Sequence, residues 1–187
     1  MVNSEVRERI LRATYDCVAR WGLAKTTIED AAREAGVSRA TVYRYFPGGR
    51  DELVSAVVGW EFARFFLRLY DEVHDAETLE EVMERGLVFA RHALLEHEVL
   101  QRILQTEPEI LLPRLTVESN STHKLVAAFL EPYLVRHGMA EGTDLHRAAD
   151  FLARMVLSYI GAPGRWDLDD PAQVARLVRA ELLAGIR

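Results

Sequence analysis

The stretch EDAAREAGVSRATVYRYF, residues 29–46, contains two short helical patterns around a single glycine. A helix-turn-helix needs a small residue in its first helix, a turn residue that tolerates a left-handed backbone, and an apolar residue that anchors its second helix. Ala32, Gly36 and Val42 occupy these three places. An ordinary helical hairpin uses the same residue types, so this fragment alone leaves both interpretations open.

Capping signals fix where these helices begin. Thr27 is followed by Asp30 three residues later, a variant of the capping box, which predicts a helix start. Ser38 is positioned to cap the second helix, which is expected to run to about Phe46. Upstream, side chains at spacings of three and four predict a first helix that ends at Gly22; they include Val6, Ile10, Ala13, Cys17 and Trp21.

The charge is distributed unevenly along the chain. Residues 1–50 carry nine basic and six acidic side chains, net +3, whereas residues 51–187 carry fourteen against twenty-three, net -9. A basic end can bind phosphates while an acidic remainder discourages other contacts with nucleic acid. The overall charge of -6 therefore does not exclude DNA as a partner.

The second helix of the motif exposes short or basic side chains that can enter a major groove and meet base edges and phosphates. These side chains are Arg39, Ala40, Thr41, Arg44 and Tyr45. The pattern predicts that this surface binds DNA.

The segment SRATVYRYF resembles the recognition helix of the TetR family of one-component transcription regulators, in which a Tyr-x-Tyr/His-Phe ending is typical. The resemblance covers residues 6–57: an amphipathic first helix, the stretch TTIEDAAREAGVSRATVYRYF, and a basic residue that opens a connecting helix. It implies a helix-turn-helix DNA-binding domain over residues 1–49 and a helical effector-binding and dimerisation domain over residues 50–187.

The resemblance also implies roles for single residues. Thr27 and Ser38 would cap their helices near phosphates, and Tyr43 and Tyr45 would donate their hydroxyls to the DNA backbone. The candidates for base reading are Arg39, Ala40, Thr41 and Arg44. Arg44 is the foremost of these because a guanidinium can pair bidentately with guanine, although a phosphate contact is an equal alternative.

The linker after this helix departs from the family pattern. Where the family commonly has a lysine shortly after the phenylalanine, this chain has PGGR, which is one residue longer. The phosphate contact of that lysine is therefore assigned to Arg50.

The rest of the chain also reads as helical. After a connecting helix over about residues 50–70, further segments are expected near residues 78–97, 99–106, 109–137, 142–161 and 171–185. No strand, repeat or low-complexity tract is evident. The expected fold class is all-α, with an N-terminal three-helix head on a larger helical ligand-binding and dimerisation bundle.

In proteins that resemble TetR, the last two helices pair with their copies in a homodimer. The residues expected at that interface are Leu152, Val156, Val174, Leu177, Val178 and Leu182. Intrachain core is the alternative at each position. Two heads related by twofold symmetry would read a near-palindromic operator in double-stranded DNA.

The resemblance further implies a pocket for a small-molecule effector. Aromatic side chains with a few polar tips suit a mostly apolar ligand. The candidates are Trp60, Phe66, Phe89, His92, Phe129, Tyr133 and Tyr159. Plain packing is the alternative for each, because an aromatic residue at helical spacing usually belongs to the core.

The sequence gives less support to membrane, secreted and metal-binding proteins. Neither a membrane-crossing apolar run nor a signal peptide is apparent, so the protein is expected to be cytoplasmic and not to bind a membrane. Cys17, the only cysteine, is expected to be a buried thiol. The spacing of the histidines does not match the usual helical metal motifs, so we expect no metal and no cofactor. His92 and Glu96, one helical turn apart, remain a weak possibility for two metal ligands.

The sequence therefore predicts a ligand-responsive transcription regulator, more often a repressor in proteins of this kind, and not an enzyme. A helical-bundle enzyme and a ligand-independent DNA-binding protein are the alternatives. The sequence shows no Gly-rich phosphate-binding loop and no Cys-His arrangement that would support the enzyme alternative.

Overall fold

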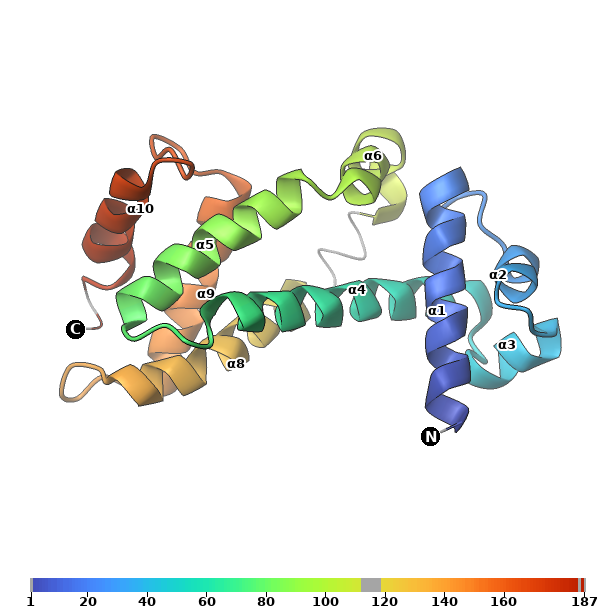
Figure 1. The fold of residues 1–187 in the computed structure, drawn as a ribbon, viewed down its shortest axis with the longest axis horizontal. Coiled ribbons are helices and arrows are strands. Elements are labelled where there is room, and N and C mark those ends of the chain that lie inside the picture. The colour runs from blue at the N-terminus through green and yellow to red at the C-terminus, as the bar shows by residue number, and fades with distance from the viewer. Residues whose placement is uncertain (1, 112–118, 185, 187) are drawn as a thin grey trace. The chain divides into compact units, whose positions relative to one another are not determined.

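The computed structural model describes residues 2–111, 119–184 and 186, and every regular element in these residues is helical (Figure 1). The elements are α1 (Val2–Trp21), α2 (Ile28–Glu34), α3 (Arg39–Tyr45), α4 (Gly49–Val73), α5 (Leu79–Leu95), α6 (Glu98–Thr106), α8 (Ser119–His137), α9 (Leu145–Gly161), α10 (Pro171–Leu177) and a π-helical segment η1 (Val178–Leu182). The all-α fold class is confirmed. None of the described helices is both long enough and apolar enough to span a bilayer.

The described residues form two compact units. The first, the head unit, comprises the chain up to Phe66 together with the segment from Glu98 to Leu111. The second, the body unit, comprises Leu67–His97 together with the described residues from 119 onward. The units therefore divide within α4 and not at residue 50, and α6 belongs to the head unit. The functional division between residues 49 and 50 stays a prediction.

The caps expected from the sequence are present in the head unit. α1 ends at Trp21, directly before Gly22, whose φ is +87°. Thr27 caps α2, because its hydroxyl accepts from the Asp30 N–H at 3.1 Å while the Asp30 carboxylate accepts from the Thr27 N–H. Gly36 turns the chain at a φ of +63°, and the Ser38 hydroxyl accepts from the Thr41 N–H at 3.1 Å.

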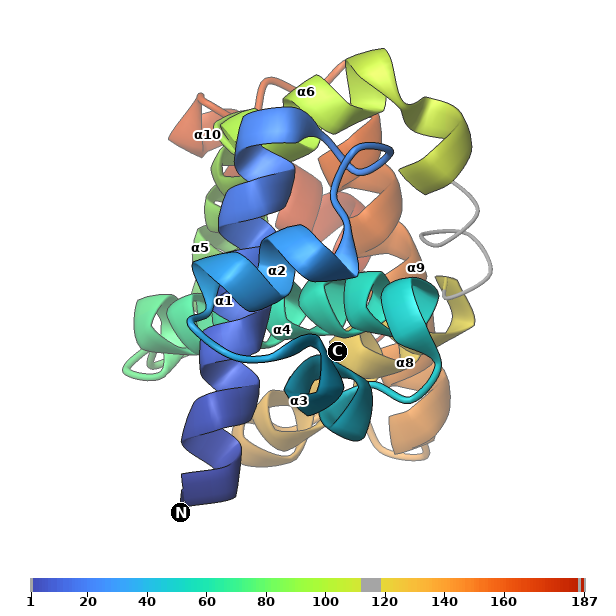
Figure 2. The same ribbon diagram turned by 90° about the vertical axis from the view of Figure 1, so that its right-hand side faces the viewer.

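Small residues let the helices of the head approach closely. Ala31 and Ala32 of α2 are buried in one cluster with Ile10 of α1, Val42 of α3 and the following Phe46. Figure 2 shows α2 crossing α1 with α3 beside it. Packing of this kind fixes the direction in which α3 presents its outer face.

Two of the side chains whose spacing predicted α1, Cys17 and Trp21, differ in burial. Cys17 is fully buried as predicted, and burial, followed by the nearby carboxylates of Glu34 and Asp30, raises the pKa of its thiol. Trp21, the last residue of α1, is 40% exposed, and its ring lies under the Arg20 guanidinium.

The body unit has its own apolar core. Leucines from four of its elements are fully buried: Leu79 and Leu87 of α5, Leu134 of α8, Leu152 of α9, and Leu177 of α10. Arg91 of α5 donates to the Ile160 carbonyl of α9 at 2.6 Å. The α8 and α9 helices share the most extensive helix contact in this unit.

Most of the expected dimer residues lie in this core. Leu152, Leu177, Val178 and Leu182 have no exposed surface and Val174 has 2%, whereas Val156 remains partly exposed. Five of the six are thus buried within the single chain, as the intrachain alternative expects, and their place at a dimer interface stays a prediction.

Candidate nucleic-acid interface and effector site

The outer face of α3 carries four exposed residues at helical spacing: Arg39, Ala40, Tyr43 and Arg44. Tyr43 is 44% exposed although it is a large aromatic residue. Val42 and Phe46 point the other way, into the core of the head. The helix therefore presents two guanidiniums, a phenol and a small side chain to solvent, which suits base edges and phosphates.

The two arginines of this face differ in their surroundings. Arg39 forms an ion pair with Glu29 of α2, with 2.8 Å between the Nη2 and Oε1 atoms. The Arg44 guanidinium lies 5.3 Å from the centre of the Tyr45 ring and has no acidic partner within ion-pair distance among the described residues. Arg44 is therefore the cation of α3 whose charge is available without breaking an existing pair.

The other predicted DNA contacts lie around this face. Thr41 is half-buried and its hydroxyl lies 2.9 Å from that of Ser38. Tyr45 packs partly against the core of the head. Thr27 is exposed at the start of α2, where its hydroxyl is engaged by the Asp30 carboxylate at 2.6 Å. Whether these groups touch DNA stays a prediction.

Arg50 has a structural role that the sequence did not suggest. Its Nε donates to the Thr26 carbonyl at 2.9 Å, and its Nη2 donates to the Leu23 carbonyl. Both carbonyls belong to residues 22–27, the α1–α2 loop. The remaining Nη1 forms a long ion pair with Asp51, at 3.8 Å, and would exchange this carboxylate for a phosphate. Arg50 can therefore hold the loop and still offer a donor to a phosphate.

The same loop is held by a second segment of the head unit. The Glu107 carboxylate accepts from the Ala24 N–H at 2.9 Å. Arg102 of α6 donates to the carbonyls of Val18, at 3.0 Å, and Ala19 in the last turn of α1, where the Val18 carbonyl also accepts from the Gly22 N–H at 2.9 Å. Neither residue was identified from the sequence, because each contact joins positions more than 80 residues apart.

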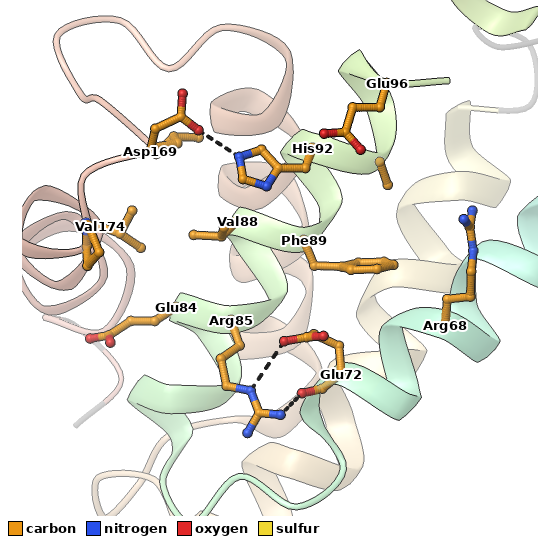
Figure 3. Close-up of a pocket in the computed structure, with 13 residues that line it drawn as sticks. Arg68, Glu72, Glu84, Arg85, Val88, Phe89, His92, Glu96, Asp169 and Val174 are labelled. Atoms are coloured by element: carbon orange, nitrogen blue, oxygen red, sulfur yellow. Dashed lines mark hydrogen bonds and ion pairs between the residues drawn. The ribbon is translucent and has the colours of Figure 1, made fainter. Parts of the chain in front are cut away.

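The body unit contains a cavity of about 550 Å³, which we call the α5 groove (Figure 3). One face of α5 forms its floor: Glu84, Arg85, Val88, Phe89, His92, Ala93 and Glu96. Arg68 and Glu72 of α4 lie on one side. Leu168, Asp169, Pro171 and Val174, at the start of α10, lie on the other.

Hydrogen bonds and ion pairs hold the side chains around this groove. His92 is 2.7 Å from the Asp169 carboxylate, which ties α5 to the segment before α10. The Arg85 guanidinium faces three carboxylates, those of Asp75 at 2.9 Å, Glu81 at 3.3 Å and Glu72 at 3.6 Å. A hydrogen bond from Arg85 lowers the pKa of Asp75. His92 thus pairs with Asp169 and not with the Glu96 suggested by the sequence.

The seven effector candidates do not come together at one site. Phe89 and His92 line the α5 groove. In the head unit, Trp60 packs on Tyr15 and Phe66 on Phe65. In the body unit, Phe129 lies against Tyr133, and Tyr159 donates its hydroxyl to Glu181.

A compact three-helix head with a capped, outward-facing second helix of a helix-turn-helix defines a DNA-binding protein of that class. Residues 10–57 match the model of the family described as bacterial regulatory proteins, tetR family. A Mycobacterium tuberculosis protein, named an HTH-type transcriptional regulator, is 28% identical over 177 residues, which cover 91% of this chain and 82% of the relative.

Two further relatives share a name. The HTH-type transcriptional regulator AlkX of M. tuberculosis is 27% identical over 180 residues, covering 92% of this chain and 83% of the relative. The crystal structure of the TetR family repressor AlkX from Dietzia matches with a TM-score of 0.67 and 25% identity, covering 96% and 98% of the two chains. Residues 10–57 therefore form a DNA-binding head of the TetR family type, and the relatives that match most of the chain support a helix-turn-helix transcriptional regulator.

Proposed function

We propose that this protein is a ligand-responsive repressor that binds a near-palindromic operator as a homodimer and is released by a small effector. The observation that carries the proposal is the outer face of α3, where Arg44 and Tyr43 stand exposed and Arg44 lacks an acidic partner among the described residues. Support for repression comes from the Dietzia relative, which is called a TetR family repressor implicated in the biodegradation of n-alkanes.

In this proposal α3 enters the major groove. Arg44 reads a base, a contact worth about 1–3 kcal/mol of discrimination if it is bidentate to guanine. Tyr43, Tyr45, Thr27, Ser38 and the Nη1 of Arg50 contact the phosphate backbone, which fixes the orientation of the head. Arg39, Ala40 and Thr41 lie beside Arg44 and complete the reading surface.

The homodimer is proposed to form through the outer face of α9 and α10. Phe151 of α9 is 42% exposed, a high value for a phenylalanine, and Val156 on the same helix is partly exposed. Aromatic residues of this kind are enriched at protein interfaces. A twofold pair would place two recognition helices about 34 Å apart, one turn of DNA.

The effector is proposed to bind in the α5 groove. Glu96 at the end of this groove is followed directly by His97 and then by α6, and we propose that a shift of α5 is passed along the chain to the start of α6. Arg102 forms hydrogen bonds with α1, and Glu107 forms one with the α1–α2 loop. Arg50 of α4 forms hydrogen bonds with the same loop. A ligand that prefers one position of α5 would therefore bias the head through covalent and hydrogen-bonded links.

The proposal is tested by fluorescence anisotropy with labelled DNA that flanks the protein's own gene and with a scrambled duplex, at physiological salt. Specific binding should exceed non-specific binding by at least about 1000-fold. Arg44→Ala should narrow this preference and Tyr43→Ala should weaken binding to all DNA. Arg12→Ala, an exposed α1 position paired with Glu8, is the matched control.

If the flanking DNA does not bind, selection from a random library replaces it. Failure to enrich any sequence would overturn the DNA-binding assignment. Light scattering at micromolar concentration tests the dimer separately, since a monomer cannot read both half-sites of a palindrome.

A further inference from the structure

We infer that the α5 groove selects an organic cation, an apolar molecule that carries an amine or quaternary ammonium group, over a neutral or anionic molecule of the same size. The inference rests on the proposed function only in taking this groove as the effector site. It is carried by the balance of charged groups around an apolar floor.

The groove has the size and the apolar surface of a ligand site. Its volume of about 550 Å³ falls within the range of about 300–1,000 Å³ for small-molecule sites. Val88, Phe89 and Ala93 provide apolar surface on α5, and Leu168 and Val174 lie on the opposite side. Leu168 and Val174 are 5% and 2% exposed, so this side of the groove is anchored in the core.

Carboxylates outnumber cations around this apolar surface. Four of them line the groove, from Glu72, Glu84, Glu96 and Asp169, against the guanidiniums of Arg68 and Arg85. Arg85 is already neutralised, because Glu72, Asp75 and Glu81 all lie within 3.6 Å of it. It therefore has no unbalanced positive charge with which to attract an anion.

Two of the carboxylates have no partner in the described part of the chain. The side chains of Glu84 and Glu96 make no hydrogen bond or ion pair there. Glu84 lies in α5 and Glu96 is the C-cap of that helix, twelve residues or about 18 Å further along its axis, so they stand near the two ends of the groove. Figure 3 places Glu84 toward Val174 and Glu96 beside His92. A ligand on the apolar floor thus meets an unpaired negative charge at either end.

Arg68 is the lining residue that would favour an anionic ligand. It lies on the α4 side and has no acidic partner among the described residues. One guanidinium faces a groove that holds two unpaired carboxylates, in a stretch of chain from residue 51 onward whose net charge is -9. An approaching anion would therefore be repelled on balance, and a cation attracted.

The test uses three fluorescent probes that differ only in their terminal group: pyrenebutylamine, pyrenebutanol and pyrenebutyrate. Each is titrated into the full-length protein and its anisotropy is followed. We expect the amine to bind about tenfold more tightly than the alcohol, which corresponds to about 1.4 kcal/mol from two partly exposed carboxylates, and the butyrate to bind more weakly than the alcohol. Raising the salt concentration should reduce the advantage of the amine.

Variants of the unpaired carboxylates test whether they cause the preference for the amine. The double variant Glu84→Gln with Glu96→Gln should remove most of the advantage of the amine and leave the affinity of the alcohol unchanged. Glu141→Gln removes the same charge from the exposed α8–α9 connection, outside the groove, and should change neither affinity. Unchanged selectivity in the double variant would overturn the inference.

Other outcomes are equally decisive. Tighter binding of the butyrate, abolished by Arg68→Ala, would show that the groove is an anion site. Equal affinity for all three probes, or no binding of any, would also overturn cation selection. Adding the amine to the protein–DNA complex separates the two proposals: binding without release of DNA leaves cation selection standing and refutes the effector role of the groove.

Discussion

The Glu107 carboxylate occupies the space into which a side chain at Gly22 would project: a Cβ atom built on Gly22 would overlap the Glu107 Oε1. The same carboxylate accepts the Ala24 N–H through its Oε2. Gly22, which follows α1, is therefore required for its φ of +87°, and a side chain there would also displace the Glu107 carboxylate from the Ala24 N–H.

Gly22→Ala should destabilise the protein by about 2 kcal/mol or more, because the alanine must adopt a left-handed backbone and also displace Glu107 from Ala24. Gly36→Ala is the control: its φ is +63° but nothing lies within 4 Å of a Cβ there, so only the backbone cost of about 1–2 kcal/mol remains. Urea denaturation measures both. If the Glu107 contact contributes to the loss, Gly22→Ala made in a Glu107→Ala background should lower the free energy of unfolding by no more than Gly36→Ala does.

Arg50→Ala should lower both stability and DNA affinity. The loss of two hydrogen bonds from a charged donor to the α1–α2 loop is expected to cost about 1.5–3 kcal/mol of unfolding free energy. If Nη1 contacts a phosphate, the slope of log affinity against log salt should also fall by about one. Arg50→Lys should keep the slope but not the stability, since an ammonium cannot reproduce the guanidinium fork. A slope unchanged in Arg50→Ala would confine this residue to holding the loop.

Glu29→Gln should strengthen DNA binding. Glu29 holds Arg39 at 2.8 Å in the unbound head, and that pair must open before Arg39 can bind a phosphate or a base. Removing the carboxylate frees the guanidinium and also removes a charge that repels DNA, so an increase of roughly fivefold is expected at low salt. Anisotropy titrations of Glu29→Gln and Glu5→Gln provide the comparison, and equal affinities of the two variants would contradict the role assigned to the pair.

Phe151→Glu should convert a dimer into a monomer in light scattering, because a buried unpaired charge at the centre of an interface is costly. Leu125→Glu is the matched control, since Leu125 is 48% exposed on α8, outside the proposed interface. A variant at Phe151 that remains dimeric at micromolar concentration would place the interface elsewhere.

His146 should make stability depend on pH in a defined direction. Its ring lies 2.9 Å from the Glu131 carboxylate, and this hydrogen bond raises the pKa of His146. A raised pKa in the folded state means that the pair contributes stability below the unfolded pKa of about 6.5 and loses it as pH rises through the folded value. Wild type should therefore exceed His146→Gln in Tm at about pH 5.5 and match it at about pH 8.5. A difference that does not change with pH would contradict this.

Local signals determined most of the head. The caps at Thr27 and Ser38, the turn at Gly36 and the end of α1 at Gly22 depend on contacts within a few residues, so the sequence was sufficient to predict them. The exposed positions of α3 followed in the same way, because the helical period places Val42 and Phe46 on the opposite side. The family resemblance rests on these same local features.

Only the tertiary structure decided what covers each helix. Spacing shows that a helix has an apolar face but not which element packs on it, so Leu152 and Leu177 could be read equally as interface or core. The roles of Arg50, Arg102 and Glu107 on the head, and the union of residues 68–96 with 168–174 in the α5 groove, depend on contacts between distant parts of the chain. Such contacts follow from the packing of whole helices, which no short stretch of sequence encodes.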